Sequence, residues 1–502
     1  MPTPAPDTGL QILLEVSPIG PRRGALEHAI RDAITSERLF PGDRLPSTRF
    51  LAQQLGLGRG TVNDAYTHLT AEGWLTARTG SGTRVAERAP AGAGSPRPDP
   101  LALANPTHDL SPGRPDAATF PRRAWAAAIK EVVATAPNEA FGYGDPRGRP
   151  ELREALAGYL GRVRGVRTVP EQILVCSGYT QALGLIADVL AARRPAGQVA
   201  MENPALPDHV SIVSRHLPVL ELPVDAEGLD SDVLLASGAH AVVCTPAHQF
   251  PSGVALSHGR RSTVLDWARS TSSWIVEDDY DGDFTYERHP MSALQSGSPE
   301  QVLYVGSTSK SLGPAVRLGW IASPAELIEP LVHAKRLADR QTGPIDQLAL
   351  AVLLGNGSYD RHLLSVRRLY RRRRDQLVAA VRLHLPAARV LGVAAGLHAI
   401  VELPPGGPSE ADVVQALHDA SIRVHPYRGY LRGTPTDGPV RVIVGYAAPS
   451  SHGYGAAVEA LVTALVGVTA AAPPGRRPPP RRLPELGTAL APTRPVRSAP
   501  AR

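Results

Sequence analysis

The stretch VLYVGSTSKSLGPAVRLGW, residues 302–320, decides the fold of most of this chain. Its first five residues form an apolar run of strand length, which ends in Ser307, further hydroxyl residues and Lys310. Arg317 follows seven residues after the lysine. Hydroxyl groups beside a lysine and an arginine suit a phosphate group, because each can donate a hydrogen bond to its oxygens. A single lysine after a strand is usually a surface residue, so this interpretation needs support from other strands.

Two other apolar runs end in residues of matching chemistry. Residues 274–276 (WIV) lead into 277–280 (EDDY), and residues 173–176 (ILVC) lead into 177–180 (SGYT) and a helical pattern. Acids at the end of a buried strand lie where α/β folds hold ligands, and a glycine turn before a helix is an anion site. Strand and helix patterns alternate over residues 118–467, which predicts an α/β domain with a mostly parallel sheet.

These three strand ends together predict a pyridoxal phosphate site. Such a site needs a lysine for the Schiff base, an acid that keeps the pyridine nitrogen protonated, donors for the phosphate and a group that packs on the ring. The chain offers candidates for each in a plausible order along the sequence.

The N-terminal residues follow a different pattern. Within residues 24–39 the apolar side chains recur at i, i+3, i+4, i+7 and i+8, which is one face of a helix. Ser47 is expected to cap a second helix in which Phe50, Leu51 and Leu55 face inward.

A third helix is expected over residues 59–72, after a tight glycine connection. Its N-terminal residues Arg59 and Thr61 are then free to enter the major groove, as in a helix-turn-helix. Residues 78–83 (RTGSGT) predict the tip of a hairpin, whose glycines allow close approach to a groove. This hairpin would be the wing of a winged helix.

Composition places the chain among soluble, globular, multidomain proteins. It has 502 residues, 43% hydrophobic and 20% charged, and a net charge of +6 that permits a polyanionic partner. Its two cysteines, Cys176 and Cys244, lie in apolar runs, so we expect buried thiols and a reducing compartment. We expect no signal peptide, no membrane-spanning segment and no metal site, and a cytoplasmic location.

Four segments are expected. Residues 1–86 form the DNA-binding domain, 87–117 a linker rich in Pro, Ala and Gly, 118–467 the α/β domain, and 468–502 a disordered Pro/Arg-rich tail. The arginine run 371–374 falls in a long helical pattern, and we expect it to lie on a solvated outer face rather than to bind nucleic acid.

Residues 41–87 (PGDRLPSTRFLAQQLGLGRGTVNDAYTHLTAEGWLTARTGSGTRVAE) resemble the GntR class of winged helices. The α/β domain resembles the fold-type I, aspartate aminotransferase-like proteins that bind pyridoxal phosphate, through residues 141–166 (FGYGDPRGRPELREALAGYLGRVRGV), 245–261 (TPAHQFPSGVALSHGRR), 275–284 (IVEDDYDGDF) and 305–320. With both parts in one chain, the protein resembles the MocR/GabR-type subfamily of GntR transcription regulators.

For the DNA-binding domain, the resemblance implies contacts with a double-stranded DNA operator. It assigns phosphate contacts to Arg44 and Arg49, the minor groove to Gly80, and the major groove to Arg59, Gly60 and Thr61.

For the large domain, the resemblance makes Lys310 the lysine of the internal aldimine. Asp278 would pair with the pyridine nitrogen, and Tyr280 would donate to the phenolic oxygen. The phosphate would fall to the turn at Gly178 and to Tyr179, Thr180, Ser307, Ser309 and Arg317.

In the DNA-binding domain, Gly58 stands at the cap of the recognition helix, where Ser is usual, and the large domain departs from the family pattern at three places. Leu206 stands where an aromatic residue usually packs on the ring, and leucine loses the aromatic geometry. Phe250-Pro251, with Gln249 beside it, replaces the Asn-Pro of aminotransferases. Arg441, slightly out of register, is the nearest candidate for binding a ligand carboxylate.

The resemblance implies a homodimeric, pyridoxal phosphate-dependent transcription regulator, which senses an amino compound or a B6 vitamer by Schiff-base exchange at Lys310. One alternative is an aminotransferase with an accessory DNA-binding domain, which multiple-turnover transamination would support. A further alternative is a regulator whose large domain serves only for dimerisation, for which Leu206 is the best argument.

Overall fold

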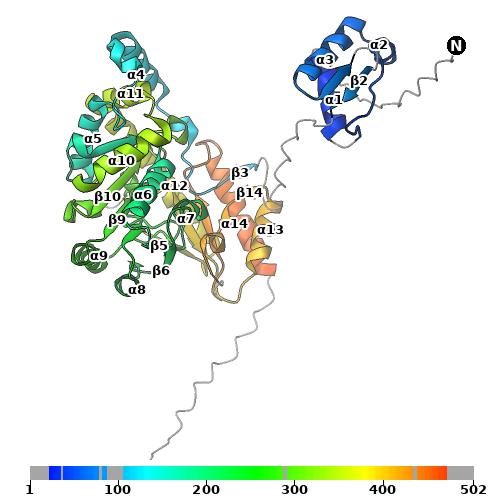
Figure 1. Cartoon of the computed structure of the whole chain (residues 1–502). Helices are drawn as coiled ribbons and strands as arrows, with labels where there is room; N and C mark the ends of the chain where they lie inside the picture. Colours follow the sequence, from blue (N-terminus) through cyan, green and yellow to red (C-terminus); the bar gives the residue numbers. More distant parts are fainter. Residues whose placement is uncertain are drawn as a thin grey trace, which may run out of the picture. The chain divides into compact units, whose positions relative to one another are not determined.

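The computed structural model describes residues 22–35, 38–78, 82–86, 106–286, 291–433 and 438–471. The chain divides into two compact units, residues 1–102 and residues 103–502 (Figure 1). The described elements of the first unit are α1 (Arg22–Thr35), α2 (Thr48–Leu55), α3 (Arg59–Ala71), β1 (Leu75–Arg78) and β2 (Gly82–Val85).

The first unit is a small helical domain with one hairpin. Ser47 caps α2 as expected, by accepting a hydrogen bond from the Phe50 amide at 3.2 Å, and Gly56 ends the helix with a φ of 62°. Strands β1 and β2 pair antiparallel as the expected hairpin. Phe50 does not face inward: its side chain is 52% exposed, because Leu51 and Ala52 take the buried positions of this short helix.

The second unit contains an eight-stranded sheet in the order β4-β11-β10-β9-β8-β5-β6-β7. The five central strands β10, β9, β8, β5 and β6 run parallel, and β11 runs antiparallel to both of its neighbours. The strands are β4 (Ile173–Cys176), β5 (Val199–Asn203), β6 (Val219–Asp225), β7 (Gly228–Leu229), β8 (Ala241–Cys244), β9 (Trp274–Asp278), β10 (Val302–Ser307) and β11 (Gly319–Ala322).

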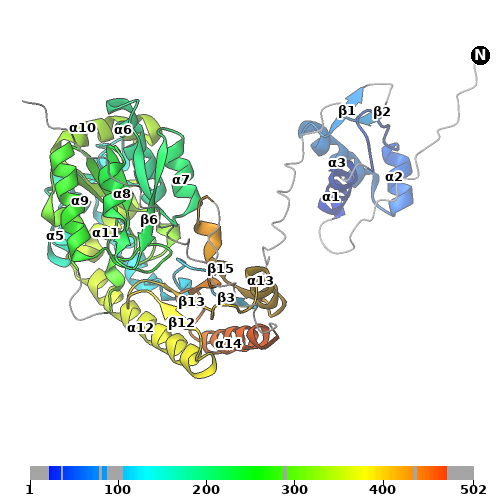
Figure 2. The same cartoon turned by 90° about the horizontal axis from the view of Figure 1, so that it is seen from below.

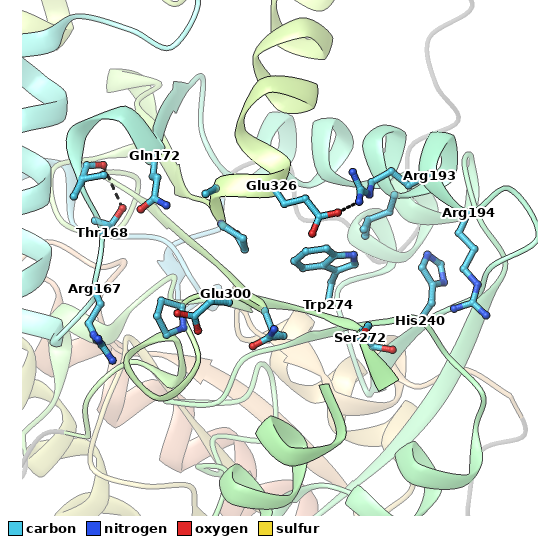
Figure 3. Close-up of a pocket in the computed structure, with 17 residues that line it drawn as sticks. Arg167, Thr168, Gln172, Arg193, Arg194, His240, Ser272, Trp274, Glu300 and Glu326 are labelled. Carbon is cyan, nitrogen blue, oxygen red and sulfur yellow. Dashed lines mark hydrogen bonds and ion pairs between the residues drawn. The ribbon is translucent and has the colours of Figure 1, made fainter. Parts of the chain in front are cut away.

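Helices cover both faces of this sheet (Figure 2). In β8, Ala241 and Val243 belong to the cluster with α6 (Tyr179–Arg193) and α10 (Ala325–Asp339), whereas Val242 and Cys244 belong to the cluster with α9 (His258–Thr271). Burial on both faces explains why these strands read as continuous apolar runs. At the edge where the parallel strands begin, Trp274 opens β9 (Figure 3).

A smaller sheet lies in the C-terminal part of the unit, in the order β12-β13-β16-β15. Its elements and the remaining helices of the unit are β12 (Arg389–Leu391), β13 (His398–Glu402), β15 (His425–Pro426), β16 (Arg441–Gly445), α4 (Arg122–Thr135), α5 (Pro150–Arg164), α7 (Pro207–Ser214), α8 (Ser231–Ala236), α11 (Pro344–Gly355), α12 (Ser358–His384), α13 (Glu410–Asp419) and α14 (Tyr454–Ala471).

Helix α14 is long and apolar enough to cross a membrane by length and composition, although we expected no such segment. Tyr454, Val458, Leu461 and Leu465 recur at helical spacing on this helix and are buried in the core of the large unit. A core helix of this kind passes the same test of length and composition.

The last residues of the expected linker, 106–117, belong to the large unit. There β3 (His108–Asp109) pairs parallel with β14 (Ile422–Arg423), and Leu110 is fully buried in the core. A two-residue strand is too short to show an apolar period, so the sequence pattern does not distinguish it from a linker. Residues 87–105 of the expected linker and 472–502 of the expected tail lie outside the described residues.

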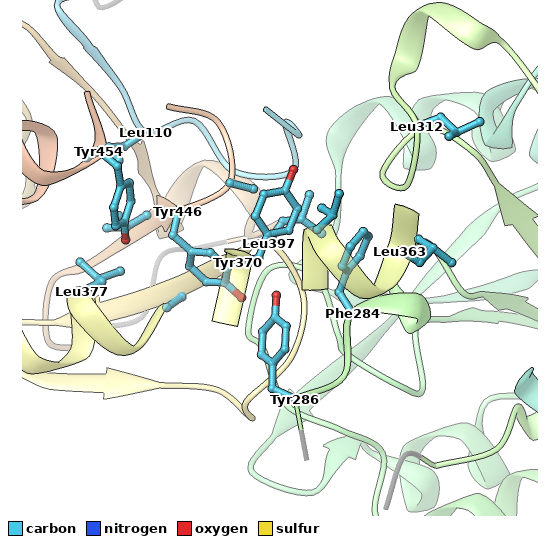
Figure 4. Packing of buried hydrophobic residues seen from close by; sticks show 14 of the residues in the cluster. Leu110, Phe284, Tyr286, Leu312, Leu363, Tyr370, Leu377, Leu397, Tyr446 and Tyr454 are labelled. Atoms are coloured by element: carbon cyan, nitrogen blue, oxygen red, sulfur yellow. The ribbon is translucent and has the colours of Figure 1, made fainter. Parts of the chain in front are cut away.

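The arginine run on α12 is only partly solvated. Arg371 and Arg372 are exposed, but Arg373 is 3% exposed. Its Nη2 donates to Asp116 Oδ2 at 2.9 Å, and its Nη1 donates to the carbonyl of Ala447, also at 2.9 Å. The aromatic side chains of the surrounding cluster, among them Tyr370, Tyr446 and Tyr454, gather here from α12 and the C-terminal elements (Figure 4).

Asp116→Ala is expected to reduce the free energy of unfolding of the large unit by about 3 kcal/mol, because it leaves the buried guanidinium of Arg373 without its carboxylate. Urea denaturation measures this loss. Asp375→Ala is the matched control, since Asp375 is an exposed acid on the same helix and should change stability by about 1 kcal/mol or less. Equal effects of the two substitutions would contradict the assignment of Asp116 as the anchor of this segment.

Candidate functional site

A cavity of about 300 Å³ lies where the parallel strands of the large sheet end. It brings together residues from the ends of β9 and β10, the start of α6 and the segment at Gly113. The sequence-predicted residues that line it are Tyr179, Thr180, Leu206, Asp278, Tyr280, Ser307, Ser309, Lys310 and Arg317.

Lys310 lies in the turn that follows β10. Its Nζ donates a hydrogen bond of 2.6 Å to the carbonyl of Gly113, in the segment that leads back to the first unit. Burial lowers the pKa of Lys310, while the carboxylates of Asp281 and Asp278 act in the opposite direction. A lowered pKa increases the neutral, nucleophilic fraction of the amine.

Three consecutive acids follow the apolar run of β9, and their contacts distinguish their roles. Glu277 accepts hydrogen bonds from the backbone amides of Leu294 and Gln295 at 2.7 and 2.9 Å. Asp279 forms a buried, forked ion pair with Arg164 at 2.7 and 2.9 Å. Asp278 alone of the three lines the cavity, so it is the acid available to a ligand.

The surroundings of Asp278 test whether a pyridine ring fits. Its carboxylate is 5% exposed, and Oδ1 has no hydrogen-bond partner among the described residues. Burial raises the pKa of Asp278 well above its usual range, with Asp279 and Asp281 adding to the effect. A protonated ring nitrogen would supply both the missing donor and the missing positive charge, so the cavity fits pyridoxal phosphate at this point.

The part of the cavity near Gly178 and Arg317 suits a phosphate group. Gly178, with a φ of 104°, precedes the N-terminus of α6, and a Cβ atom built on it would lie 3.4 Å from Nη1 of Arg317. The guanidinium of Arg317 thus lies beside a helix N-terminus, which is a site for anions. Ser307, the last residue of β10, and Ser309, in the turn that follows, also line the cavity.

Sequence reasoning missed a buried hydrogen-bond chain behind Tyr280. The Tyr280 hydroxyl lies 3.1 Å from Nδ1 of His248, which lies 2.8 Å from Oδ2 of Asp281. The motif around His248 was visible in the sequence, but its partner is 33 residues further along the chain. This chain fixes the position of Tyr280 at the cavity wall.

His209 is a second residue that sequence reasoning missed. Its ring lies 4.7 Å from the ring of Tyr179 between centroids, and both rings line the cavity. Burial, together with the charge of Lys310, lowers the pKa of His209 to about 4, so its ring is neutral. The neutral ring of His209 therefore gives the cavity wall an aromatic group, which Leu206 does not supply.

Arg441 is not among the residues that line the cavity. Its Nε donates to Glu402 Oε2 at 2.8 Å, and its guanidinium lies over the ring of Tyr427. Glu402 also binds Arg389. Arg441, the predicted partner of a ligand carboxylate, is therefore paired with Glu402 and lies outside the cavity lining.

In the first unit, Arg49, Arg59 and Gly60 are exposed at the starts of α2 and α3, and Thr61 is half-buried. The N-cap of α3, Gly58, makes no side-chain capping bond, which leaves the first amides of this helix open to a phosphate. Arg44 is exposed beside β2, with its Nε 3.1 Å from a Cβ built on Gly82. Gly80 lies outside the described residues.

Comparison with known proteins matches both units. Residues 23–85 match the gntR family of bacterial regulatory proteins, and residues 108–461 match the aminotransferase class I and II family. The chain is 32% identical to the uncharacterised HTH-type transcriptional regulator YhdI of Bacillus subtilis (strain 168), over 86% of this chain and 93% of the relative.

Other relatives have the same organisation. The HTH-type pyridoxine biosynthesis transcriptional regulator PdxR of Corynebacterium glutamicum is 32% identical over 82% of this chain and 89% of its own length. The probable rhizopine catabolism regulatory protein MocR of Rhizobium meliloti is 31% identical over 73% of this chain and 78% of its own length.

Among solved structures, the α-aminoadipate aminotransferase LysN of Thermus thermophilus, complexed with N-(5'-phosphopyridoxyl)-L-leucine, is similar with a TM-score of 0.64. It is 25% identical, and the match covers 72% of this chain and 92% of that one. The large unit thus has the fold-type I aminotransferase architecture, whose cofactor is pyridoxal phosphate.

A DNA-binding winged helix joined to an aminotransferase fold defines a class of bacterial transcription regulators. This chain belongs to that class, the MocR-type regulators of the GntR family.

Proposed function

We propose that this regulator senses an amino compound or a B6 vitamer at the Lys310 cavity and changes its binding to a DNA operator in response. The observation that carries the proposal is that Lys310 and Asp278 line one cavity in a chain that also has a winged helix. Asp278 Oδ1 has no hydrogen-bond partner among the described residues, so it is available to a ligand. The relative PdxR is named for the control of pyridoxine biosynthesis, which supports a ligand of this chemistry.

The residues of the cavity divide the work of holding pyridoxal phosphate. Arg317, the Gly178 turn, Thr180, Ser307 and Ser309 would hold the phosphate, Asp278 the ring nitrogen, and Tyr280 the phenolic oxygen. Once bound, the cofactor supplies an aldehyde carbon that bonds reversibly to a primary amine.

The hydrogen bond from Lys310 to Gly113 connects the cavity to the path toward the DNA-binding unit. A Lys310 side chain not bonded to the cofactor would be free to carry a positive charge and to donate the charge-assisted hydrogen bond to the carbonyl of Gly113 that the structure shows. Gly113 precedes Asp116, which Arg373 anchors to α12. We infer that residues 106–117 are the first part of the chain whose contacts change when an effector replaces Lys310.

A gel-shift experiment tests the sensor role. The full-length protein is titrated onto its own upstream region with and without pyridoxal phosphate and with a panel of amines. We expect at least one amine to change the apparent operator affinity in the presence of the cofactor, and a Lys310→Ala variant to bind DNA without that response. If Lys310→Ala responds to the amine like the wild type, the alternative in which the large unit serves only for dimerisation is favoured.

The second candidate, an aminotransferase with an accessory DNA-binding domain, has less support from the geometry. Arg441 is paired with Glu402 outside the cavity, so an amino acid substrate lacks its usual guanidinium partner in this arrangement. Steady transamination over many turnovers would favour this candidate over the sensor.

We also propose a cytoplasmic homodimer formed through the large unit. Large apolar side chains remain exposed in one stretch of the monomer, at Val133, Phe141 and Tyr143, which supports an interface there. Light scattering of the full chain should give twice the monomer mass, and a monomer at micromolar concentration would contradict this expectation.

A further inference from the structure

A second, larger hollow of about 1030 Å³ lies at the opposite edge of the sheet from the Lys310 cavity (Figure 3). It is formed where strands begin, by residues before β8, β9 and β10 together with the end of α6 and the start of α10. Strand β9 runs from Trp274 in this hollow to Asp278 in the Lys310 cavity, so the two sites lie at the two ends of the same strand.

His240 is the residue that sets this hollow apart from an ordinary surface depression. It lines the hollow but is only 4% exposed, and neither of its ring nitrogens has a hydrogen-bond partner among the described residues. Burial lowers the pKa of His240, while the nearby backbone of Gln198 acts in the opposite direction. The neutral ring has one N–H donor and one acceptor. Leaving both unpaired is costly, and buried polar groups of this kind normally have a partner.

The packing around His240 holds its ring in place. A Cβ atom on Gly197 would lie 2.4 Å from the Cε1 and Nδ1 atoms of the ring, so this position has room only for glycine. The imidazole therefore has little freedom to turn toward another partner.

Arginine and tryptophan complete the hollow. The guanidinium of Arg194 is exposed beside His240 and has no hydrogen-bond acceptor in the described part of the chain. The neighbouring Arg193 is paired with Glu326, which leaves Arg194 as the available cation on this side. The half-buried ring of Trp274 lies in the middle of the hollow, between these residues and the far wall (Figure 3).

We propose that this hollow binds a small anion carried on a flat ring, such as an aromatic phosphate ester or carboxylate. Arg194 binds the anionic group through charge-assisted hydrogen bonds, and the N–H of His240 donates to the same group or to the ring substituents. Trp274 packs against the ring of the ligand. The site does not depend on the sensor role of Lys310, since it shares no residue with that cavity.

Phenyl phosphate and benzoate are suitable probes, with benzyl alcohol as a ring without charge and inorganic phosphate as a charge without a ring. Each is titrated by calorimetry into the full-length holoprotein after borohydride reduction, so that bound pyridoxal phosphate keeps the Lys310 cavity filled. We expect at least one of the two aromatic anions to bind more tightly than both benzyl alcohol and inorganic phosphate. Tighter binding of phenyl phosphate identifies a phosphate ester as the ligand, and tighter binding of benzoate identifies a carboxylate.

Arg194→Gln is expected to weaken the binding of the preferred anion by about tenfold or more, because a charge-assisted hydrogen bond is lost. Arg215→Gln, at an exposed arginine outside the hollow, is the matched control and should leave the affinity unchanged. His240→Gln should also weaken binding. If this buried substitution impairs folding, the Arg194→Gln variant still tests the proposal, because Arg194 is exposed. Binding of neither anion, or equal affinity in Arg194→Gln and the wild type, would overturn the proposal.

Discussion

Lys310→Ala is expected to abolish covalent retention of pyridoxal phosphate completely. The chain has three lysines, Lys130, Lys310 and Lys335, and of these only Lys310 lines the cavity that holds Asp278. Lys335 is fully buried on α10 and paired with Asp339, so its amine is committed elsewhere. Borohydride reduction followed by peptide mass spectrometry should find the whole adduct of the wild type on Lys310.

Lys130→Ala is the matched control for this experiment, because Lys130 is an exposed lysine on α4 that does not line the cavity. It should retain the full adduct and the visible absorbance of the wild type. An adduct on Lys130 or Lys335 in the wild-type protein would show that the cavity does not select its lysine. Loss of DNA binding by Lys310→Ala in the absence of any effector would show that the substitution disturbs more than the sensor.

Arg59→Ala is expected to weaken operator binding by about 10- to 100-fold, the range of about 1–3 kcal/mol that a good base contact contributes. Arg59 is the first residue of α3, its side chain is exposed, and the N-cap before it leaves the helix N-terminus open. If the contact is to phosphate instead, the affinity should fall on all sequences alike and the salt dependence should decrease by about one counterion.

Titrations of labelled operator and of unrelated DNA at several salt concentrations measure both quantities. Arg23→Ala serves as the control, because Arg23 is an exposed arginine on α1 that is paired with Glu27 within its own helix. It should change the affinity little. An Arg59→Ala variant that binds the operator as tightly as Arg23→Ala would remove α3 from the DNA interface.

Local patterns were sufficient for the strands and for much of the cavity. The apolar runs 173–176, 274–276 and 302–306 became β4, β9 and β10, buried strands of one mostly parallel sheet. Because the ends of parallel strands meet at one edge, the residues after them had to converge, and they line a single cavity. Both cysteines are buried in strands, as expected.

Contacts between distant residues were beyond these patterns. The position of Phe50 depends on which side of a two-turn helix meets the core, and its exposure reverses the expected one. Arg373 looked like its solvated neighbours until Asp116, 257 residues earlier, proved to be its partner. The contact between the rings of His209 and Tyr179 likewise joins residues that are distant in the sequence, so no local pattern predicts it.

The amino-acid sequence by itself determined that a winged helix and a cofactor-binding α/β domain share this chain, because helical and strand periods, turn glycines and the residues after each strand are local properties. Only the tertiary structure decided that His248 and Asp281 lie behind Tyr280, that Arg441 is paired with Glu402, and that a buried histidine without a partner among the described residues faces a hollow at the far edge of the sheet. Those outcomes depend on burial and on partners far apart in the chain, and such contacts leave no periodic trace in the sequence.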